Sequence, residues 1–339
     1  MGRFYPMKKS YFKLFLGLVL VLILVSLINL RTGSVWIPWH DFTRVISGQL
    51  SDSGYHTIVW QYRMPKLLVA AMAGAGLGLA GLLLQTMFRN PIVGPYVLGI
   101  SSGSGLAVAL VMMSGLAYFS GIHSAYILSL AAIAGSFLVL AFNLFLFEQL
   151  RKTEILLIAG LMIGAFSGAV LSILSVYAPA EQLQRYFFWT MGNLTVSRPV
   201  FLWILGLGVP LLFIISASKI KYLNLLLLGD DYVRASGVRL DRLRWFIILI
   251  SGILTGLITA VTGPLAFVGL IIPHITRMIF RTQMLQYLIP GVFLTGATFM
   301  IAADVISQLP GRAGVLPVNS ITALLGAPLV IHLLLRNSR

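Results

Sequence analysis

The stretch Gly263-Pro264-Leu265-Ala266-Phe267-Val268-Gly269-Leu270-Ile271-Ile272-Pro273-His274 decides the fold. It lies inside an apolar run from Trp245 to Thr276 that is too long for one simple membrane helix. Its prolines and glycines interrupt helical hydrogen bonding at a depth where lipid supplies neither donors nor acceptors. Backbone that is broken there must face protein or a water-filled path, which predicts a helix break inside a membrane protein.

The composition of the whole chain agrees with that setting. Of its 339 residues, 58% are hydrophobic and 10% are charged, whereas a soluble domain has roughly 25% charged residues. So much apolar surface cannot be buried in one water-facing globule, so lipid must solvate much of the exterior. The apolar runs are continuous, which excludes a β-barrel of short alternating segments. We therefore expect an all-α polytopic membrane protein.

Ten apolar segments define the predicted spans, which would form one transmembrane domain over 1–339. They cover approximately 14–30, 67–88, 98–119, 124–147, 155–177, 200–218, 245–262, 265–280, 286–306 and 315–335. Most of the 24 Lys and Arg residues lie in alternate breaks between these segments, and this places both termini in the cytoplasm. No small-x-small cleavage site follows the first segment, so it is expected to be retained.

Several functional classes are excluded by what the sequence lacks. The net charge of +15 is spread over the breaks and forms no basic domain, which argues against nucleic-acid binding. The chain has no cysteine, and its histidines lack the spacing of metal ligands, so no metal site is predicted. It contains no P-loop and no nucleophile elbow, so we expect neither an enzyme nor a bound cofactor. The glycine-rich stretch 74–81 follows no strand and predicts close helix packing.

A second proline break resembles the first. Asn90-Pro91 ends one predicted span, and Pro91 precedes Pro264 by 173 residues, about half the chain. The two spans run in opposite directions in the predicted topology. Interrupted segments at matching positions are typical of transporters built from two inverted repeats, here approximately 1–180 and 181–339. The alternative is two unrelated helix kinks.

The segment 222–242 is the most informative of the predicted cytoplasmic breaks. Asp230 or Asp231 can cap a short helix, Gly237 can end it in the left-handed conformation, and Asp241 can cap the next helix. Small residues would then be exposed on a compact knob that fits a cleft on a partner. The alternative is a solvated loop that only sets the topology.

Two cations stand at the outer end of the second span, in Arg63-Met64-Pro65-Lys66. Pro65 suits the first turn of a helix, but positive charge there opposes the helix dipole. The pair therefore suggests a partner that carries carboxylates. The alternative is that both side chains reach toward lipid phosphate.

Ionisable groups within the spans are few, and no acid is placed clearly at mid-membrane. Asp304 lies near the outer end of the ninth span, and His274 is expected to be a packed, hydrogen-bonded residue. A proton- or sodium-coupled secondary transporter, the alternative function, would need such an acid. Ser167, Ser172 and Ser175 place small polar groups along the fifth span, where they line a path or pack against a neighbour.

Taken together, these residues resemble the FecCD/BtuC permeases, the membrane subunits of ABC importers for ferric siderophores, haem and cobalamin. The resemblance runs from about Trp60 to Arg336. It is carried by Arg63-Met64-Pro65-Lys66, Gln85, Asn90-Pro91, Leu98-Gly99-Ile100, Trp189-Thr190-Met191-Gly192, Leu228-Gly229-Asp230, Gly237-Val238, Gly263-Pro264 through Pro273-His274-Ile275-Thr276-Arg277, Ala303-Asp304 and Leu316-Pro317 to Leu325-Gly326-Ala327-Pro328.

The resemblance implies a ten-helix permease in a bacterial plasma (inner) membrane, with a ferric siderophore as the first expected cargo. Its implied partners are a second permease, with a homodimer favoured, two ATPase subunits that bind ATP and Mg²⁺, and an extracytoplasmic binding protein. The implied ATPase-coupling residues are Asp230, Asp231, Arg234, Ala235, Ser236, Gly237 and Val238. Binding-protein docking is assigned to Arg63 and Lys66. Arg312 replaces a family arginine that is missing after Ala303-Asp304.

Overall fold

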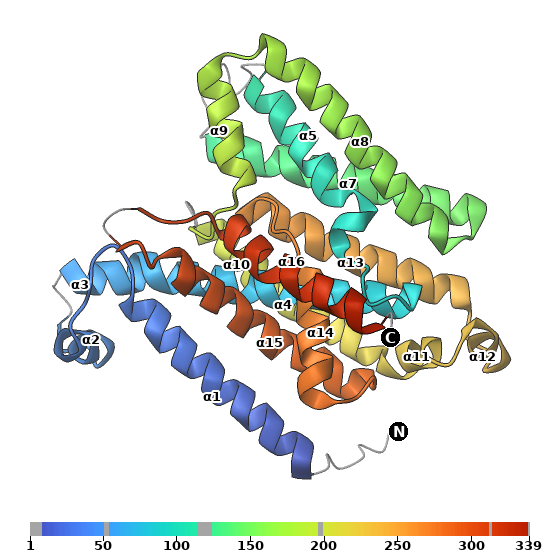
Figure 1. Cartoon of the computed structure of the whole chain (residues 1–339), viewed down its shortest axis with the longest axis horizontal. Coiled ribbons are helices and arrows are strands. Elements are labelled where there is room, and N and C mark those ends of the chain that lie inside the picture. Colours follow the sequence, from blue (N-terminus) through green and yellow to red (C-terminus); the bar gives the residue numbers. More distant parts are fainter. Residues whose placement is uncertain (1–8, 51–53, 114–123, 196–198, 312–313, 338–339) are drawn as a thin grey trace.

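The computed structural model describes residues 9–50, 54–113, 124–195, 199–311 and 314–337, and these contain helices but no β-strand (Figure 1). In chain order the elements are α1 (Lys9–Arg31), α2 (Trp39–Ile46), α3 (Gly54–Thr57), the π-helical turn η1 (Ile58–Arg63), α4 (Met64–Phe88), the 3₁₀ turn η2 (Pro95–Leu98), α5 (Ile100–Met113), α7 (Ser124–Leu150), α8 (Thr153–Tyr177), α9 (Ala180–Thr190), α10 (Pro199–Ser218), α11 (Ile220–Leu226), α12 (Asp230–Ala235), α13 (Leu240–Thr262), α14 (Val268–Phe280), α15 (Leu285–Ser307) and α16 (Val318–Asn337).

Each of the ten predicted spans corresponds to one apolar helix. Among the described residues, seven helices are long and apolar enough to cross a membrane, and α5, α14 and α16 are shorter apolar helices. The predicted end of the third span, beyond Met113, lies outside the described residues. The prediction of an all-α polytopic membrane protein is confirmed.

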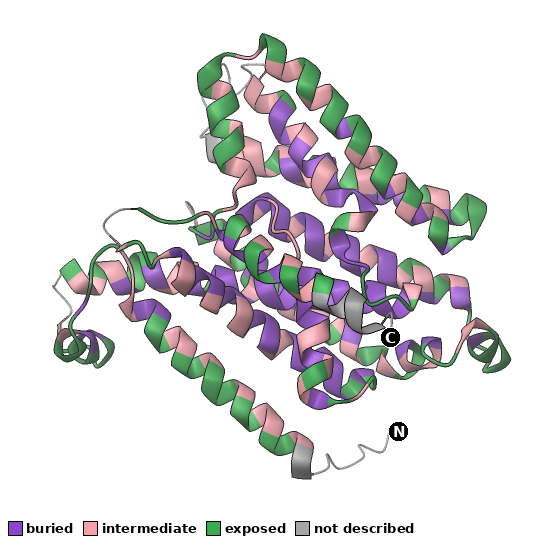
Figure 2. Cartoon of the chain, in the orientation of Figure 1, coloured by how far each residue is buried: buried purple, intermediate pink, exposed green. Residues whose placement is uncertain are grey.

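The helices form two groups that meet along α13 (Figure 1). Helices α5, α7, α8 and α9 make one group, and α13 packs against α7 from this group and against α4 from the other. In the span that contains α4, 89% of the most apolar window is buried, against 17% in α8. Figure 2 shows the same contrast, with α4 at the centre and α1 and α8 largely exposed. Lipid or further subunits must therefore cover the outer helices.

Glycines let α4 approach its neighbours closely, as the stretch 74–81 predicts. A Cβ atom added to Gly74 would lie 2.0 Å from the Gly296 carbonyl oxygen of α15. One added to Gly81 would lie 1.6 Å from the Gly269 carbonyl oxygen of α14. Neither position can hold a larger residue without moving a backbone, so these contacts fix how α4, α14 and α15 pack.

The break after α13 is satisfied by protein, as its sequence requires. Gly263 ends the helix with φ +74°, and α14 begins only at Val268. Asn319 of α16 accepts a hydrogen bond from the Ala266 amide at 2.9 Å and donates one to the Thr190 carbonyl at 3.3 Å. The Asn193 amide donates to the Thr262 carbonyl at 2.7 Å. The break is therefore tied to the end of α9 and to α16.

The break after α4 lies against the N-terminus of α14. A Cβ atom on Gly269 would lie 2.5 Å from the Pro95 ring of η2. The Gln85 side chain donates to the Leu270 carbonyl at 3.2 Å and accepts a hydrogen bond from Arg277. The two breaks that the sequence pairs as related are thus joined by direct contacts.

Two of the breaks between the predicted spans, residues 31–63 and 178–199, contain helices. Residues 31–63 include α2, α3 and η1, and a continuous helical stretch of 35 residues runs from Gly54 to Phe88. The π-helical turn lies directly before Pro65, whose missing N–H disrupts the regular i to i−4 pattern. The second loop, 178–199, contains α9, a short helix whose mean hydropathy is too low for a span.

Candidate functional site: a cytoplasmic knob and an open helix face

The predicted knob forms at the turn between α11 and α13, around α12. Within it, Asp231, Arg234, Ala235, Ser236 and Gly237 are exposed, whereas Asp230 and Val238 are half-buried. Gly237 has φ +74° directly after the helix, which confirms the predicted left-handed end. Nothing lies within 4 Å of a Cβ atom placed on Gly237, so this surface is open to a partner.

Two apolar side chains beside the knob add to this surface. Leu228 is 64% exposed and Tyr232 is 53% exposed. They flank the acidic start of α12 in a segment otherwise rich in charge. Exposed apolar groups surrounded by polar ones are typical of a surface that binds another protein. Neither residue is among the coupling residues predicted from the sequence, because an apolar side chain in a short polar segment gives no signal of its exposure.

The predicted helix caps at the knob are wrong. Gly229 stands at the N-cap of α12, and Asp230 lies in the first turn, where its carboxylate binds Arg89 and Arg244. Asp241 lies inside the first turn of α13 and pairs with Arg151 at 3.2 Å. In both cases an arginine from another part of the chain competes successfully with the local backbone N–H groups for the carboxylate.

At the outer end of α4, Arg63 points inward. The side chain is 8% exposed, and its guanidinium donates to the carbonyls of Leu30 at 2.9 Å, Arg31 at 2.7 Å and Val35. These acceptors lie at the end of α1 and in the turn that follows. Arg63 therefore closes the end of α1, whose last carbonyl groups have no helical partner.

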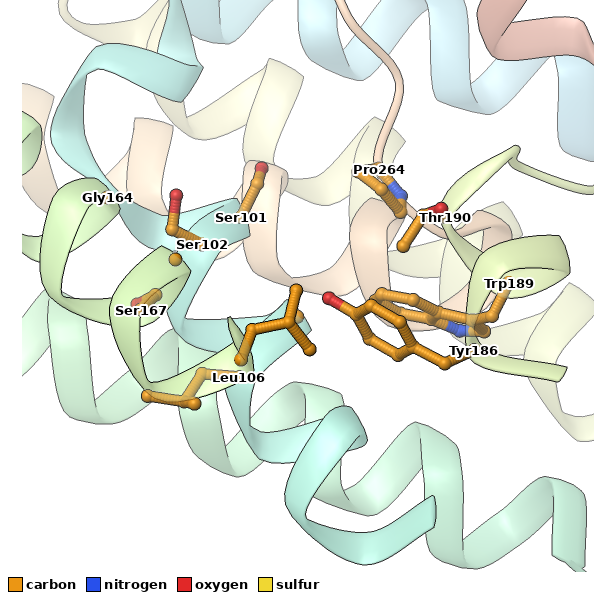
Figure 3. A pocket seen from close by; sticks show the side chains of 12 residues that line it. Ser101, Ser102, Leu106, Gly164, Ser167, Tyr186, Trp189, Thr190 and Pro264 are labelled. Carbon is orange, nitrogen blue, oxygen red and sulfur yellow. The ribbon is translucent and has the colours of Figure 1, made fainter. Parts of the chain in front are cut away.

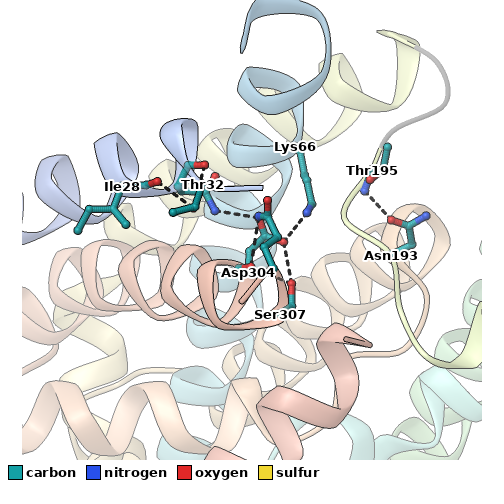
Figure 4. Close-up of polar contacts among 9 residues, drawn as sticks. Ile28, Thr32, Lys66, Asn193, Thr195, Asp304 and Ser307 are labelled. Atoms are coloured by element: carbon teal, nitrogen blue, oxygen red, sulfur yellow. Dashed lines mark hydrogen bonds and ion pairs between the residues drawn. The ribbon is translucent and has the colours of Figure 1, made fainter. Parts of the chain in front are cut away.

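Lys66 also points inward, toward Asp304 of α15 (Figure 4). Its ammonium lies 2.7 Å from the carboxylate, and Asp304 is fully buried. Asn29 of α1 donates to the same carboxylate at 2.8 Å, and Gln308 donates at 2.7 Å. The carboxylate is thus neutralised and hydrogen-bonded by three helical segments, so it is not free to bind a coupling ion.

These positions change the interpretation of the outer cations. In this structure neither Arg63 nor Lys66 presents its charge to a partner, because each is held by groups of the chain itself. The sequence pattern showed two cations but not their acceptors, which lie up to 238 residues away along the chain, as Lys66 and Asp304 do. Arg312, the third predicted docking residue, lies outside the described residues.

A cavity of about 240 Å³ opens between α5, α8, α9 and Pro264 (Figure 3). Hydroxyl groups of Ser101, Ser102 and Ser167 line it on one side, and Tyr186 and Trp189 lie on the other. The Ser167 hydroxyl is buried and has no hydrogen-bond partner among the described residues. Burial raises the pKa of Tyr186, so its phenol stays protonated at neutral pH and can donate.

Ser172 and Ser175 lie one and two turns further along α8, at a second cavity of about 590 Å³ that Gln184 and Tyr186 of α9 also line. Their hydroxyls donate to carbonyls of their own helix, at 2.9 Å to Gly168 and 2.8 Å to Ser172. The three predicted path serines therefore line one helix face with two cavities. No charged side chain lines either cavity in the described part of the chain.

The remaining predicted residues have structural surroundings. Asn90 accepts a hydrogen bond from the Ile92 amide at 3.0 Å and so shapes the turn at Pro91. Pro273 is buried inside α14, and His274 follows it, half-buried. Among the described residues no three His, Cys, Asp or Glu side chains gather as metal ligands would.

Fold and site together define a class: a polytopic helical membrane protein with an exposed knob at one end and an open helix face along its side. The family model of the FecCD transport family matches residues 19–336, and the chain belongs to this family. It is therefore a transport permease of the ABC importer class.

Two relatives named for their substrates are similar to this chain in sequence over nearly its whole length. The chain is 32% identical to the vitamin B12 import system permease protein BtuC of Klebsiella pneumoniae, over 95% of this chain and 93% of that protein. It is 33% identical to the molybdate import system permease protein MolB of Haemophilus influenzae, over 94% of each chain. A solved structure, described as an inward-facing conformation of a metal-chelate type ABC transporter, matches with a TM-score of 0.80 and 33% identity, over 96% of this chain and 99% of that one.

Proposed function

We propose that this permease carries an iron chelate from an extracytoplasmic binding protein into the cytoplasm of a bacterium, across the plasma (inner) membrane. A ferric siderophore is the first candidate, and the alternatives are haem, which also holds iron, and cobalamin, an organic chelate of cobalt. Two separate ATPase subunits bind ATP and Mg²⁺ and move the knob. The permease then alternates between outward-open and inward-open packings of its helices.

The choice of an organic chelate as the substrate is supported by the uncharged lining of the face formed by α8 and α9. A bare oxyanion such as molybdate is best held by cationic side chains or by helix N-termini. The two cavities offer serine hydroxyls, aromatic rings and an unpartnered Ser167 hydroxyl instead. Such a surface suits a bulky organic chelate that shields the charge of its metal. The relatives alone do not decide between an organic chelate and an oxyanion, because the vitamin B12 permease and the molybdate permease have nearly equal sequence identities to this chain.

The proposed partners bind at opposite ends of the molecule, the ATPase at the knob and the binding protein at the outer ends of the helices. The exposed small and apolar residues around α12 support a cleft-binding role toward the ATPase. In the proposed docking of the binding protein, Arg63 and Lys66 hold the outer ends of α1, α4 and α15 in place, and Arg312 is the charge that meets the binding protein. The proposal therefore keeps all three residues but gives the first two a supporting role.

The test is uptake by proteoliposomes that contain the permease with its ATPase and binding protein. We expect ATP-dependent accumulation of a ferric siderophore, with haem and cobalamin assayed in parallel and molybdate as the oxyanion competitor. Uptake of molybdate alone would reject the chelate. Uptake driven by an ion gradient without ATPase would reject the whole assignment in favour of a secondary transporter.

A further inference from the structure

The carboxylate of Asp230 joins two arginines that come from different spans. One oxygen binds the Arg89 guanidinium, and the other lies 2.6 Å from Arg244. Arg89 directly follows the last residue of α4, and Arg244 lies in the first turns of α13. Both carboxylate oxygens are thus engaged by charged donors, which make the strongest hydrogen bonds in proteins.

Local geometry holds both arginines toward this carboxylate. Arg89 has φ +48°, a left-handed conformation that turns the chain at the end of α4. Its Nε atom also donates to the Leu226 carbonyl at 3.0 Å, which ties in the end of α11. The Arg244 side chain is 11% exposed, whereas those of Asp230 and Arg89 are 35% and 44% exposed, so water screens the Arg244 contact less than the Arg89 contact. The triad of Asp230, Arg89 and Arg244 therefore connects α4, α11, α12 and α13 at one point.

The helices that meet there are those that carry the two breaks. Helix α4 runs into the Asn90-Pro91 break, and α13 runs into the Gly263-Pro264 break. A displacement of α12 reaches both helices through one carboxylate. By contrast, both residues of the exposed Arg185–Glu181 pair lie within α9.

We propose that Asp230 is the positioning residue that transmits movement of the knob to the membrane helices, through Arg89 to α4 and through Arg244 to α13. This inference rests on the proposed coupling role of α12. Removing the carboxylate leaves two cations facing each other at the base of the knob, so α12 loses its link to both helices. The exposed surface that binds the ATPase stays as it was.

The experiment compares Asp230→Asn with wild type in proteoliposomes and records ATP hydrolysis, chelate uptake and copurification of the ATPase. We expect uptake per ATP to fall about tenfold, the usual size of a lost coupling between sites, with ATPase copurification unchanged. Glu154→Gln is the matched control, because it removes an exposed carboxylate at the start of α8 that does not contact the knob. Asp230→Glu, which keeps the charge, should retain coupling.

A second variant separates transmission from simple stability. Arg89→Gln combined with Asp230→Asn relieves the repulsion between the cations, so thermal stability should recover while uptake per ATP stays low. Recovery of both quantities, or unchanged uptake per ATP in Asp230→Asn, would overturn the inference.

Ala235→Trp tests the underlying coupling role, because it adds bulk to the exposed face of α12 without straining the backbone. If Ala235→Trp uncouples and Asp230→Asn does not, only the transmission inference fails. If neither variant changes coupling, the proposed role of α12 fails as well.

Discussion

A buried carboxylate is tolerated only while its partners remain, and the partners of Asp304 come from three helical segments. Replacing Lys66 with Met leaves the charge buried and unpaired, which should destabilise the protein by about 3–5 kcal/mol. The measurement is the midpoint of thermal unfolding in detergent. Arg44→Met, which removes an exposed cation of α2, should leave the midpoint unchanged.

The double variant Lys66→Met with Asp304→Leu should recover part of this loss, because the unpaired buried charge is gone while the Asn29 and Gln308 amides lose their acceptor. A normal midpoint for Lys66→Met alone would mean that the ion pair contributes little. It would then favour the original prediction that Lys66 presents its charge to the binding protein.

Gly81 tests how closely α4 and α14 approach. Gly81→Ala forces a methyl group into the Gly269 carbonyl oxygen, and the clash involves backbone that cannot rotate away. We expect the free energy of unfolding to fall by about 1–3 kcal/mol, with a lower midpoint of thermal unfolding. Gly206→Ala in α10 is the control, because a Cβ atom there meets nothing within 4 Å. A lower midpoint for both variants would point to a general intolerance of alanine.

The sequence predicts the role of a residue when that role depends on its neighbours along the chain. It does not predict a role that depends on contacts with distant parts of the chain. Gly237 and Gly263 end helices with positive φ, as their neighbours in the sequence indicate. The roles of Arg63, Lys66 and Asp230 depend on acceptors and donors far along the chain. Charge at a helix end looks the same whether it faces a partner protein or a buried carboxylate, so the sequence could not show that Arg63 and Lys66 contact groups of the chain itself.

At the scale of elements, the stability of the Gly263–Phe267 break depends on Asn319. Asn319→Leu removes the acceptor of the Ala266 N–H and the donor to Thr190, leaving both backbone groups unpaired. Amide hydrogen exchange should become faster across the break, with the centres of α13 and α4 unchanged. Ser320→Ala, the exposed neighbour, should leave exchange as in wild type. Unchanged exchange in Asn319→Leu would show that other contacts hold the break.

Apolar spans were predictable because hydropathy is a local property that lipid enforces. Short helices such as α2 and α9 were not, since eight to eleven residues of mixed polarity do not differ from a loop in composition. Asn319 carried no signal either, because one amide in the last predicted span has no pattern around it. Its role comes from the packing of α16 against the break.

At the scale of the whole molecule, a single chain leaves the face formed by α8 and α9 open. The cavities along α8 and α9 expose Gln184 and Tyr186 beside the serines, and lipid cannot satisfy such groups. We propose that a second copy of the permease closes this face, so that the path lies between two identical chains. The natural sequence contains no cysteine, so one introduced thiol can report on the contact alone.

Val176 near the end of α8 is 77% exposed, and Val176→Cys should form a disulfide-linked dimer when membranes are oxidised. Leu207→Cys is also apolar and 65% exposed, but it lies in α10, which packs mainly against α4 and α13 and not along the face formed by α8 and α9, so this variant should stay monomeric. Cross-linking through Leu207→Cys alone would move the interface to α10. If neither thiol cross-links and an unlike permease copurifies with the chain, that second chain closes the face in a heterodimer.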